Sequence, residues 1–528
     1  MKMKNTGFSN LVEMLEENCC RYPKKIALVF GAKRINYENL LFISKKFASA
    51  LSHTGVREFD RVCLWLPNLP EFVYSFFAIL MLRAIVCPVN NMFKREEAKF
   101  ILEDSGAKVI IVSMDKLEDA ENILSRLDSL KSIICVSSPK NKKNILDFYT
   151  LVDTSKAIQE KIDIKKEDIA EIIYTSGTTG NPKGVVLLHK NLVANIKDCI
   201  KVIKVTKRDT FICILPLFHS FASTVCMLLP ISRGSKIVIM RALKPFKRII
   251  RSIFKNKVTI FVGIPSVYNI LSEIKLSRLK LFLNYFLNPI RLCISGAASL
   301  PAPVLKKFTK KFKRPLIEGY GLTETSPVVS LNPLIGKRKP QSVGVPLPSV
   351  NIRVVDKEGN TLSPHKVGEL IIKGDNVMKE YYKSETETEK ALKKGWLYTG
   401  DLARIDEEGY IYIMGRLKEM INVRGLNVYP REIEDILYKH PKVKETAVVG
   451  VFHPRRGEVP VAFIVKKKND LEKKEIINYL RVNLASYKVP LKLFFKEALP
   501  KNPTGKILKQ ELAKEVEDAF RKRTDKRE

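Results

Sequence analysis

The chain has 528 residues, of which 45% are hydrophobic and 9% aromatic, and this composition excludes a disordered or collagen-like protein and predicts roughly two to four globular domains. Its 92 lysines and arginines outnumber its 56 aspartates and glutamates, which gives a formal net charge of +36. Such a charge favours anionic partners, namely nucleic acid, an anionic membrane face or phosphorylated small molecules, but it does not select one of them.

Strand and helix patterns alternate along the first 150 residues. A helix around Met14, a strand at 26–30 and short apolar runs at 61–66 and 108–112 follow one another. Such alternation predicts parallel α/β units. A similar alternation, richer in glycine and proline, continues from 169 to 415.

Two apolar stretches raise the question of a membrane span. Residues 72–82 are too few to cross a bilayer before Arg83 interrupts them. Residues 211–232 contain no acidic or basic side chain, but they include prolines, serines and His219, which are costly in hydrocarbon. We expect the second stretch to be buried and to line an apolar cavity.

The pattern changes after Arg416. We predict a large α/β domain of residues 1–416 and a smaller α+β domain of residues 417–528. The smaller domain is expected to contain, in chain order, a helix at 432–440, a strand at 445–451, a strand at 459–465 and a helix at 473–485.

Cysteine and histidine usage indicates a reducing compartment. Nine cysteines are dispersed without a CxxC pair, and the adjacent Cys19 and Cys20 are poorly placed to bridge each other. Six dispersed histidines disfavour a structural zinc site. No long apolar run follows the N-terminal lysines, so a signal peptide is not predicted. We therefore expect a cytoplasmic protein with free thiols.

The strongest local motif is YTSGTTGNPKG at residues 174–184, which follows a probable strand at 169–174. Glycines let backbone N–H groups turn toward an anion, and hydroxyls with a lysine complete a phosphate cradle. The spacing is not that of a Walker A loop, and a polar surface turn is the alternative. The residues expected to bind phosphate are Thr175, Ser176, Gly177, Thr178, Thr179, Gly180 and Lys183.

This loop resembles the phosphate loop of the adenylate-forming superfamily, which includes acyl-CoA synthetases, peptide-synthetase adenylation domains and luciferases. Five further motifs resemble those of the family and stand in the family's order. They are PLFHS at 216–220 (acyl pocket), EGYGLTE at 318–324 (adenine and magnesium), YTGD at 398–401 (ribose), GRLKE at 415–419 (hinge) and NPTGK at 502–506 (catalytic lysine). Within the superfamily, LNVYP at 426–430, PVVS at 327–330 and NVM at 376–378 look most like bacterial long-chain fatty acid–CoA ligases.

The resemblance implies a large α/β domain of layered sheets and helices, followed by a small mobile domain. It also implies that a fatty acid is activated by ATP to an acyl-adenylate, with release of pyrophosphate, and then transferred to coenzyme A (CoA), with Mg²⁺ as cofactor. Close alternatives are an acyl carrier protein as acceptor, or an aryl or short-chain acid. A different class, a non-catalytic nucleotide or nucleic-acid binder, is disfavoured because RNA-binding motifs are absent and the catalytic residue types are present.

The resemblance also assigns roles to residues. Lys506 would reach the α-phosphate and acyl oxygens, Thr323 would bond the α-phosphate, and His219 would separate the carboxylate from the acyl pocket. From the residues alone, His219 could equally be a core histidine, Lys506 a solvated lysine, and Glu324 or Asp401 a surface acid. The remaining assignments are Glu324 and Thr175 for Mg²⁺; Gly296, Ala297, Ala298, Glu318, Gly319, Tyr320 and Gly321 around adenine; Asp401 and Arg416 for ribose; Lys418 at the hinge; and Gly425 with Leu426 at the pantetheine tunnel.

Two features of the sequence leave questions open. Ala298 stands where relatives commonly have a second glycine, which puts the detail of the adenine contact in doubt. Basic runs at 241–257 and 306–314 exceed what ATP and CoA require. They are either a solvated basic face or a peripheral docking surface for the anionic inner face of a membrane. No nucleic-acid partner is expected, a homodimer remains open, and the sequence does not reveal chain-length preference or pathway.

Overall fold

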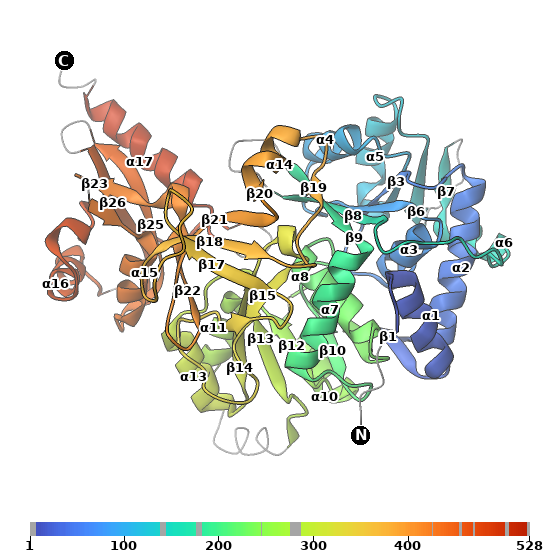
Figure 1. Cartoon of the computed structure of the whole chain (residues 1–528), viewed down its shortest axis with the longest axis horizontal. Coiled ribbons are helices and arrows are strands. Elements are labelled where there is room, and N and C mark those ends of the chain that lie inside the picture. Colours follow the sequence, from blue (N-terminus) through green and yellow to red (C-terminus); the bar gives the residue numbers. More distant parts are fainter. Residues whose placement is uncertain are drawn as a thin grey trace.

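The computed structural model shows a large mixed α/β body with a smaller unit attached at one end, drawn on the left of Figure 1. It describes residues 7–137, 144–175, 182–243, 245–274, 287–424, 426–453, 457–467, 470–501 and 506–524, with side chains described as far as residue 517.

An eight-stranded sheet with the order β19-β9-β8-β4-β3-β5-β6-β7 forms one layer of the large body. Its central strands are parallel and apolar, which is typical of a sheet covered on both faces, and the apolar runs predicted near 61 and 108 are strands within it. The strands are β3 (Arg61–Trp65), β4 (Ile85–Pro88), β5 (Val109–Ser113), β6 (Ser132–Val136), β7 (Ile145–Asp147), β8 (Ile169–Thr175), β9 (Lys183–Leu188) and β19 (Glu380–Tyr381), with helices α3 (Pro70–Met81), α4 (Arg95–Ser105), α5 (Leu117–Leu124) and α6 (Phe148–Thr154) between them.

A nine-stranded sheet with the order β16-β15-β14-β13-β12-β10-β11-β1-β2 forms a second layer. Parallel pairs run from β1 to β14, as the alternation predicts. Its strands are β1 (Ile26–Phe30), β2 (Lys33–Asn36), β10 (Thr210–Cys213), β11 (Lys236–Ile239), β12 (Ile260–Gly263), β13 (Leu292–Ser295), β14 (Leu316–Gly321), β15 (Val328–Leu331) and β16 (Val345–Pro346). The associated helices are α1 (Leu11–Arg21), α2 (Tyr37–His53), α7 (His189–Ile203), α8 (Ser220–Ala222), α9 (Leu229–Ile231), α10 (Phe246–Asn256), α11 (Pro265–Glu273) and α13 (Ala302–Phe312).

The apolar stretch 211–232 is buried inside this body, as predicted. It begins in β10 and continues through α8, a π-helical turn at Ser223–Leu228 and α9. In the described part of the chain, no helix has the length and apolarity needed to cross a membrane.

A third sheet corrects one sequence-based expectation, because α/β alternation does not continue to residue 415. The segment from 351 to 416 folds into antiparallel strands with one short helix. Turns with glycines at positive φ, such as Gly359 (88°) and Gly409 (81°), allow these direct strand connections. The elements are β17 (Asn351–Val355), β18 (Gly368–Lys373), α14 (Glu385–Ala391), β20 (Leu392–Lys393), β21 (Trp396–Ile405) and β22 (Ile411–Arg416).

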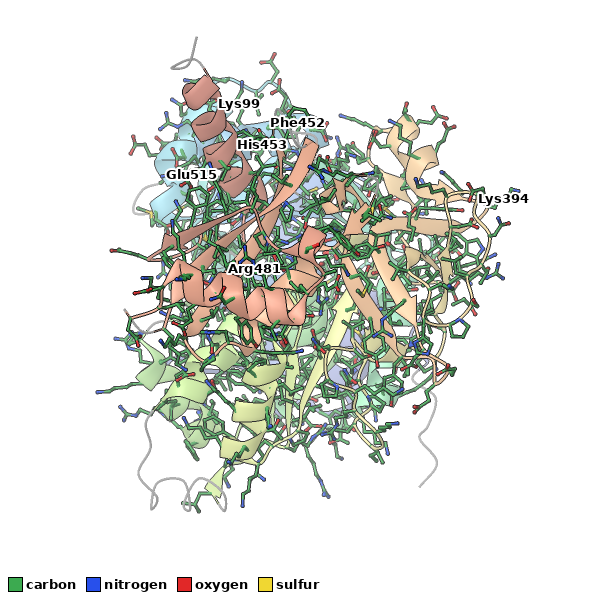
Figure 2. The ribbon with its side chains drawn as sticks, turned by 90° about the vertical axis from the view of Figure 1, so that its left-hand side faces the viewer. Lys99, Lys394, Phe452, His453, Arg481 and Glu515 are labelled. Atoms are coloured by element: carbon green, nitrogen blue, oxygen red, sulfur yellow. The ribbon has the colours of Figure 1, made fainter. Side chains whose placement is uncertain are left out.

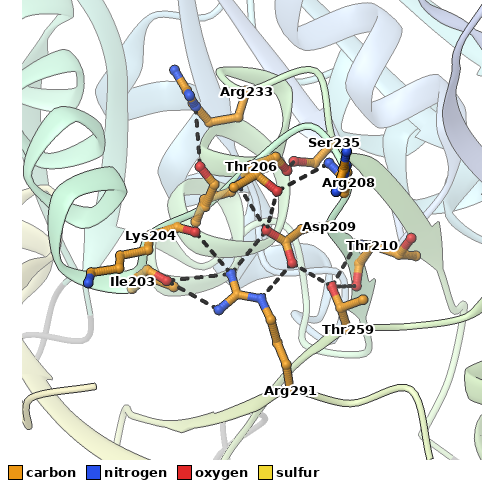
Figure 3. Close-up of polar contacts among 11 residues, drawn as sticks. Ile203, Lys204, Thr206, Arg208, Asp209, Thr210, Arg233, Ser235, Thr259 and Arg291 are labelled. Carbon is orange, nitrogen blue, oxygen red and sulfur yellow. Dashed lines mark hydrogen bonds and ion pairs between the residues drawn. The ribbon is translucent and has the colours of Figure 1, made fainter. Parts of the chain in front are cut away.

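A buried ion pair fixes the end of α7 to the nine-stranded sheet (Figure 3). Arg291 donates to both carboxylate oxygens of Asp209 at 2.7 and 3.0 Å, and it also donates to the carbonyls of Ile203 and Lys204. Thr259 donates to Asp209 at 2.8 Å. Burial alone would raise the pKa of Asp209, but Arg291 and the neighbouring donors hold this pKa below its usual range.

The C-terminal unit is the predicted small α+β fold. In the view of Figure 2 it faces the reader, with Phe452 and His453 at the end of a long strand. Its contacts with the large body include a hydrogen bond from Gln341 to Asp435 at 3.0 Å and an ion pair of Lys467 with Glu273 at 3.0 Å. The elements are β23 (Ile421–Val423), β24 (Leu426–Val428), α15 (Pro430–Lys439), β25 (Val443–His453), β26 (Gly457–Lys466), α16 (Lys473–Asn483), β27 (Lys492–Lys496) and α17 (Lys509–Thr524).

Candidate active site

A cavity of about 1210 Å³ lies where the large body meets the C-terminal unit. Both parts contribute side chains to its lining, so residues from motifs more than 300 positions apart face one space. The sequence-predicted residues that line it are Thr175, Lys183, His219, Gly296, Ala297, Gly319, Tyr320, Gly321, Thr323, Glu324, Arg416, Lys418 and Lys506.

Some predicted residues lie elsewhere. Glu318 and Asp401 are buried behind the cavity lining, and Ala298 is not part of that lining. The phosphate-loop residues Ser176, Gly177, Thr178, Thr179 and Gly180, together with Gly425, lie outside the described residues. The strands on either side of the loop are placed, since β8 and β9 pair antiparallel with Thr175 opposite Lys183.

Four polar residues that line the cavity or lie directly behind it are joined by hydrogen bonds and an ion pair. We call this group the nucleoside end (Asp401, Arg416, Tyr320 and Thr399). Arg416 Nε lies 2.9 Å from Asp401 Oδ1, and the Tyr320 hydroxyl donates to Asp401 Oδ2. Arg416 also donates to the Thr399 carbonyl at 3.0 Å. The ion pair between Arg416 and Asp401 follows from the register of the two strands, because Asp401 on β21 is paired with Arg416 on β22.

Burial shifts the titration of two of these groups. It raises the pKa of Asp401, with Arg416 and the Tyr320 hydrogen bond opposing the shift. It also raises the pKa of Tyr320 well above its usual value, so Tyr320 remains a neutral donor. A carboxylate held beside a guanidinium and an aromatic ring can accept hydroxyl groups while the ring packs on a flat base.

Glu318 supports this end from behind. Its carboxylate accepts from the Leu300 backbone N–H at 2.8 Å, and burial raises its pKa to about 7, with Arg431 of the C-terminal unit opposing the shift. Its neighbour Gly319 has no room for a side chain, because a Cβ there would lie 2.8 Å from Leu331 Cδ1.

Three lysines and one carboxylate also line the cavity, and we call this group the phosphate end (Lys183, Lys418, Lys506 and Glu324). Lys183 pairs with Glu387 and lies 5.4 Å from the centre of the Tyr381 ring. This pair lowers the pKa of Glu387 to about 2. The side chains of Lys418 and Lys506 are exposed to solvent at the cavity surface.

Desolvation is the largest cause that lowers the pKa of Lys506 and of Lys418, and repulsion from Arg416 adds to the shift of each, with Glu419 opposing it. Three lysines that line one open space are suited to hold a polyphosphate.

Glu324 is the carboxylate that the lining offers to a divalent cation beside these lysines. Its Oε1 accepts from the Tyr381 hydroxyl at 2.8 Å. Over the described part of the chain, no cluster of three or more acidic, histidine or cysteine side chains forms a ready-made metal site. The donor set therefore fits Mg²⁺, which takes one or two carboxylates and draws its remaining ligands from phosphate and water.

Two motifs meet at the middle of the cavity. Ser220 Oγ lies 3.2 Å from Thr323 Oγ1, which joins the PLFHS and EGYGLTE segments. His219 Nδ1 accepts from the Phe221 N–H at 3.2 Å, and burial lowers the pKa of His219 to about 4, so this ring is neutral at pH 7. The Phe221 ring packs closely on Gly296, since a Cβ there would lie 2.7 Å from the ring and would force the ring to shift.

Sequence reasoning missed three contacts of the site. Tyr381, Glu387 and Glu369 line the cavity, and Glu369 Oε1 accepts from the Gly400 N–H at 2.9 Å. Tyr381 is on the two-residue strand β19 opposite Val185 of β9. The adjacent tyrosines at 381 and 382, soon after the NVM motif, were the one sequence signal that pointed there.

Comparisons with known proteins agree with this arrangement. Residues 15–382 match the AMP-binding enzyme family and residues 432–506 match the AMP-binding enzyme C-terminal domain. The long-chain-fatty-acid–CoA ligases of Bacillus subtilis (strain 168) and Escherichia coli O157:H7 are 36% and 33% identical, each over 96% of this chain and over 94% and 95% of their own lengths. The crystal structure of ATP-bound MatB from Rhodopseudomonas palustris superposes with a TM-score of 0.89 at 28% identity, over 97% of this chain and 99% of that one.

Proposed function

Because the chain belongs to the AMP-binding enzyme family, we propose that it is an AMP-forming ligase that activates a fatty acid with ATP and transfers the acyl group to CoA. The observation that carries the proposal is the cavity itself. Groups suited to a nucleoside, to phosphates and to a carboxylate line one space, which continues into an apolar arm.

The nucleoside end would bind ATP. Asp401 and Arg416 would take the ribose hydroxyls, and Tyr320 would pack on adenine beside Gly296 and Ala297. These groups are already hydrogen-bonded to one another before any ligand is present, so binding requires little reorganisation.

The phosphate end would carry the first chemical step. The acid's carboxylate oxygen attacks the α-phosphorus of ATP, and pyrophosphate leaves, so negative charge must be stabilised on the phosphate oxygens. Lys183, Thr323 and Lys506 would donate to those oxygens. Glu324 would hold Mg²⁺, with Thr175 proposed as a second ligand. When bound, the ion would neutralise negative charge on the phosphates. The neutral ring of His219 would lie between the substrate's carboxylate and its acyl tail and would add no charge there.

The second step would use a different arrangement of the two domains, residues 1–416 and 417–528. CoA must approach the acyl carbon, and in the present arrangement Lys506 and the C-terminal unit cover that side of the cavity. We propose that the unit turns about a hinge near Lys418, which would withdraw Lys506 and bring Gly425 and Leu426 toward the pantetheine arm. Among the described residues, the polar contacts that this turn would break include Gln341 with Asp435 and Lys467 with Glu273.

A product screen tests the proposal. The protein is incubated with ATP, Mg²⁺, CoA and acids from C4 to C18 or aryl acids, and products are identified by mass spectrometry. We expect acyl-CoA, AMP and pyrophosphate in equal amounts with fatty acids. Thioester formation with aryl acids alone, or with acyl carrier protein but never CoA, would contradict it.

The surface of α10 favours a second partner, an anionic membrane at whose cytoplasmic face the protein would work. Five cations stand in residues 246–257 without an acid, and Ile250 and Phe254 remain 38% and 41% exposed between them. The described ion pair nearest in sequence joins Arg241 to Asp115, at 3.8 Å. Exposed cations around a protruding aromatic residue are complementary to anionic headgroups above an apolar layer, where fatty acids partition.

Vesicle sedimentation tests this surface. Reversing Lys247 and Arg251 to Glu should weaken binding to phosphatidylglycerol vesicles by at least about 2 kcal/mol, or roughly 30-fold. Each lost surface cation contributes about 1 kcal/mol, and the two added carboxylates repel the anionic headgroups. Reversing Lys306 and Lys310 on α13 is the control with the same change in net charge. Equal losses in both variants, or binding unaffected by salt, would contradict a docking role for α10.

A further inference from the structure

Side chains of three neighbouring elements, α7, the π-helical turn and β15, line one part of the active-site cavity, which we call the apolar arm. They are Cys199 and Ile203 of α7, Val225 of the π-helical turn and Val328 of β15. Leu331, the last residue of β15, also lines the cavity and is paired with Gly319. We call Leu331 and the last turn of α7 the wall of the arm. All these residues are apolar or small, so the arm is suited to a hydrocarbon tail.

A second cavity, of about 200 Å³, lies on the other side of the same wall. Leu331 lines both cavities. The last turn of α7 also borders both cavities, because Ile203 lines the first cavity and its neighbour Val202 lines the second. The lining of the second cavity is almost wholly apolar and consists of Val202, Lys204, Leu331, Pro333, Leu334, Ile335, Val345, Pro346 and Leu347.

The wall is held firmly. Leu331 is 3% exposed, and its Cδ1 fills the space that a side chain at Gly319 would need. Behind it, Gly344 approaches so closely that a Cβ there would lie 2.1 Å from the Leu331 carbonyl carbon. Arg291 fixes the α7 side of the wall by donating to the carbonyls of Ile203 and Lys204 (Figure 3). The volume of the arm is therefore set by side-chain size rather than by loop movement.

We propose that Leu331 is the end wall of the acyl tunnel and sets the longest fatty acid that the enzyme accepts, with the second cavity as a latent extension of the tunnel. This inference rests on the proposed function and names a specificity-determining residue for it. Removing the side chain of Leu331 would join the two cavities and give the ω-end of a longer acid an apolar space.

The expected effect follows from burial of methylene groups. Each additional buried CH₂ favours binding by about fourfold, whereas a tail that meets a packed wall gains nothing and must bend or leave part of itself in water. For wild type, kcat/KM should therefore rise with chain length and then fall once the tail meets Leu331. In Leu331→Ala the fall should begin at a longer acid.

The test is a chain-length profile of kcat/KM from C6 to C20 for wild type and three variants. Leu331→Ala should shift the optimum by at least two carbons to longer acids. The neighbouring Val329→Ala is the matched control, because Val329 is fully buried on the same strand but lines neither cavity, so its profile should keep the wild-type optimum. Leu331→Ala/Leu334→Trp, which refills the second cavity from its outer side, should return the optimum toward wild type.

The outcomes separate two kinds of failure. An unchanged optimum in folded Leu331→Ala, or an equal shift in Val329→Ala, would overturn the inference and leave the proposed function intact. Absence of acyl-CoA from wild type with every acid would overturn the proposed function, and the inference with it. Failure of the double variant to reverse the shift would show that the second cavity is not the extension.

Discussion

The nucleoside end and the phosphate end of the cavity differ in how their charges are arranged. At the nucleoside end, Asp401 and Arg416 satisfy one another, and Asp401 is only 4% exposed. At the phosphate end, Lys418 and Lys506 are exposed at the cavity surface, and desolvation together with repulsion from Arg416 lowers the pKa of each. The first arrangement is rigid before ligand binds, whereas the second is a concentration of positive charge that a polyphosphate would relieve.

We interpret this difference as a separation of two roles, with recognition of the nucleoside at the nucleoside end and the chemistry of adenylation at the phosphate end. A preorganised hydrogen-bond set gains affinity and orientation without needing to change during the reaction. Cations that face the open space of the cavity are placed to stabilise charge that develops on phosphate oxygens. Lys506 also belongs to the C-terminal unit, so the proposed hinge motion would withdraw its contribution while the nucleoside end stays in place.

Among the substitutions that test stability and ATP affinity, the largest effect is expected at the nucleoside end, from Asp401→Ala. The change leaves Arg416 and the Tyr320 hydroxyl without their acceptor, which should cost about 3 kcal/mol of unfolding free energy, the lower end for a buried pair because Arg416 keeps some solvent contact. ATP affinity should fall roughly 10- to 100-fold through loss of a charged hydrogen-bond acceptor. Thermal unfolding and calorimetry of ATP binding measure the two effects.

Asp406→Ala is the control for that experiment. Asp406 is also buried and pairs with Lys339, but it lies outside the cavity lining. Its loss should lower stability and leave ATP affinity unchanged. If both variants bound ATP as wild type does, Asp401 would be a purely structural residue.

The second prediction concerns Glu171 on β8, the strand that leads into the phosphate loop. Glu171 is fully buried, neither carboxylate oxygen has a hydrogen-bond partner, and burial raises its pKa to about 8. Between the unfolded pKa near 4.5 and this value the folded protein holds one more proton, so its stability falls as pH rises through that window. Glu171→Gln should recover on the order of 3 kcal/mol at pH 7 relative to wild type, and little at pH 4.5.

Denaturant unfolding from pH 4.5 to pH 8 measures this difference. Glu167→Gln, a change at an exposed residue four positions earlier in the chain, should leave the pH dependence of wild type unchanged. A parallel pH dependence in Glu171→Gln and wild type would show that Glu171 is ionised in the folded protein.

The sequence predicted which residues gather at the site better than it predicted their contacts. The resemblance of short motifs to those of the family placed Asp401, Arg416 and Lys506 in one site, and the structure brings all three to one cavity or directly behind it. The Tyr381 contact with Glu324 was not predictable, because it depends on β19 joining β9 across 200 residues. A strand of two residues has no period from which to recognise it.

The fold was also predicted in part, with the parallel strands recognised and the antiparallel sheet missed. Apolar runs near residues 26, 61 and 109 identified parallel strands, because strands buried on both faces are uniformly apolar. The antiparallel sheet from β17 to β22 was mistaken for further α/β alternation. Its strands carry mixed burial patterns such as that of β21, which have neither clear alternation nor an apolar run.

The smallest effect is expected from Glu387→Gln at the phosphate end. Glu387 pairs with Lys183 at a partly exposed site, so the pair is worth at most about 1 kcal/mol. Removing the carboxylate frees Lys183 for phosphate, and the Kd for ATP should fall no more than roughly fivefold, less at high salt. Glu389→Gln on the same helix is the control. Weaker ATP binding in Glu387→Gln would mean that Glu387 positions Lys183 instead of competing for it.

The separation of recognition from chemistry is tested most directly by measuring both half-reactions of Lys506→Ala. Acid-dependent ATP–pyrophosphate exchange reports adenylation, and release of acyl-CoA from supplied acyl-adenylate reports thioester formation. We expect exchange to fall roughly 100- to 1,000-fold, the cost of losing one preorganised charge donor, with ATP affinity and thioester formation close to wild type. Lys514→Ala, an exposed lysine on α17 outside the cavity, should change neither. Undiminished exchange in Lys506→Ala, or an equal loss in both half-reactions, would contradict the account.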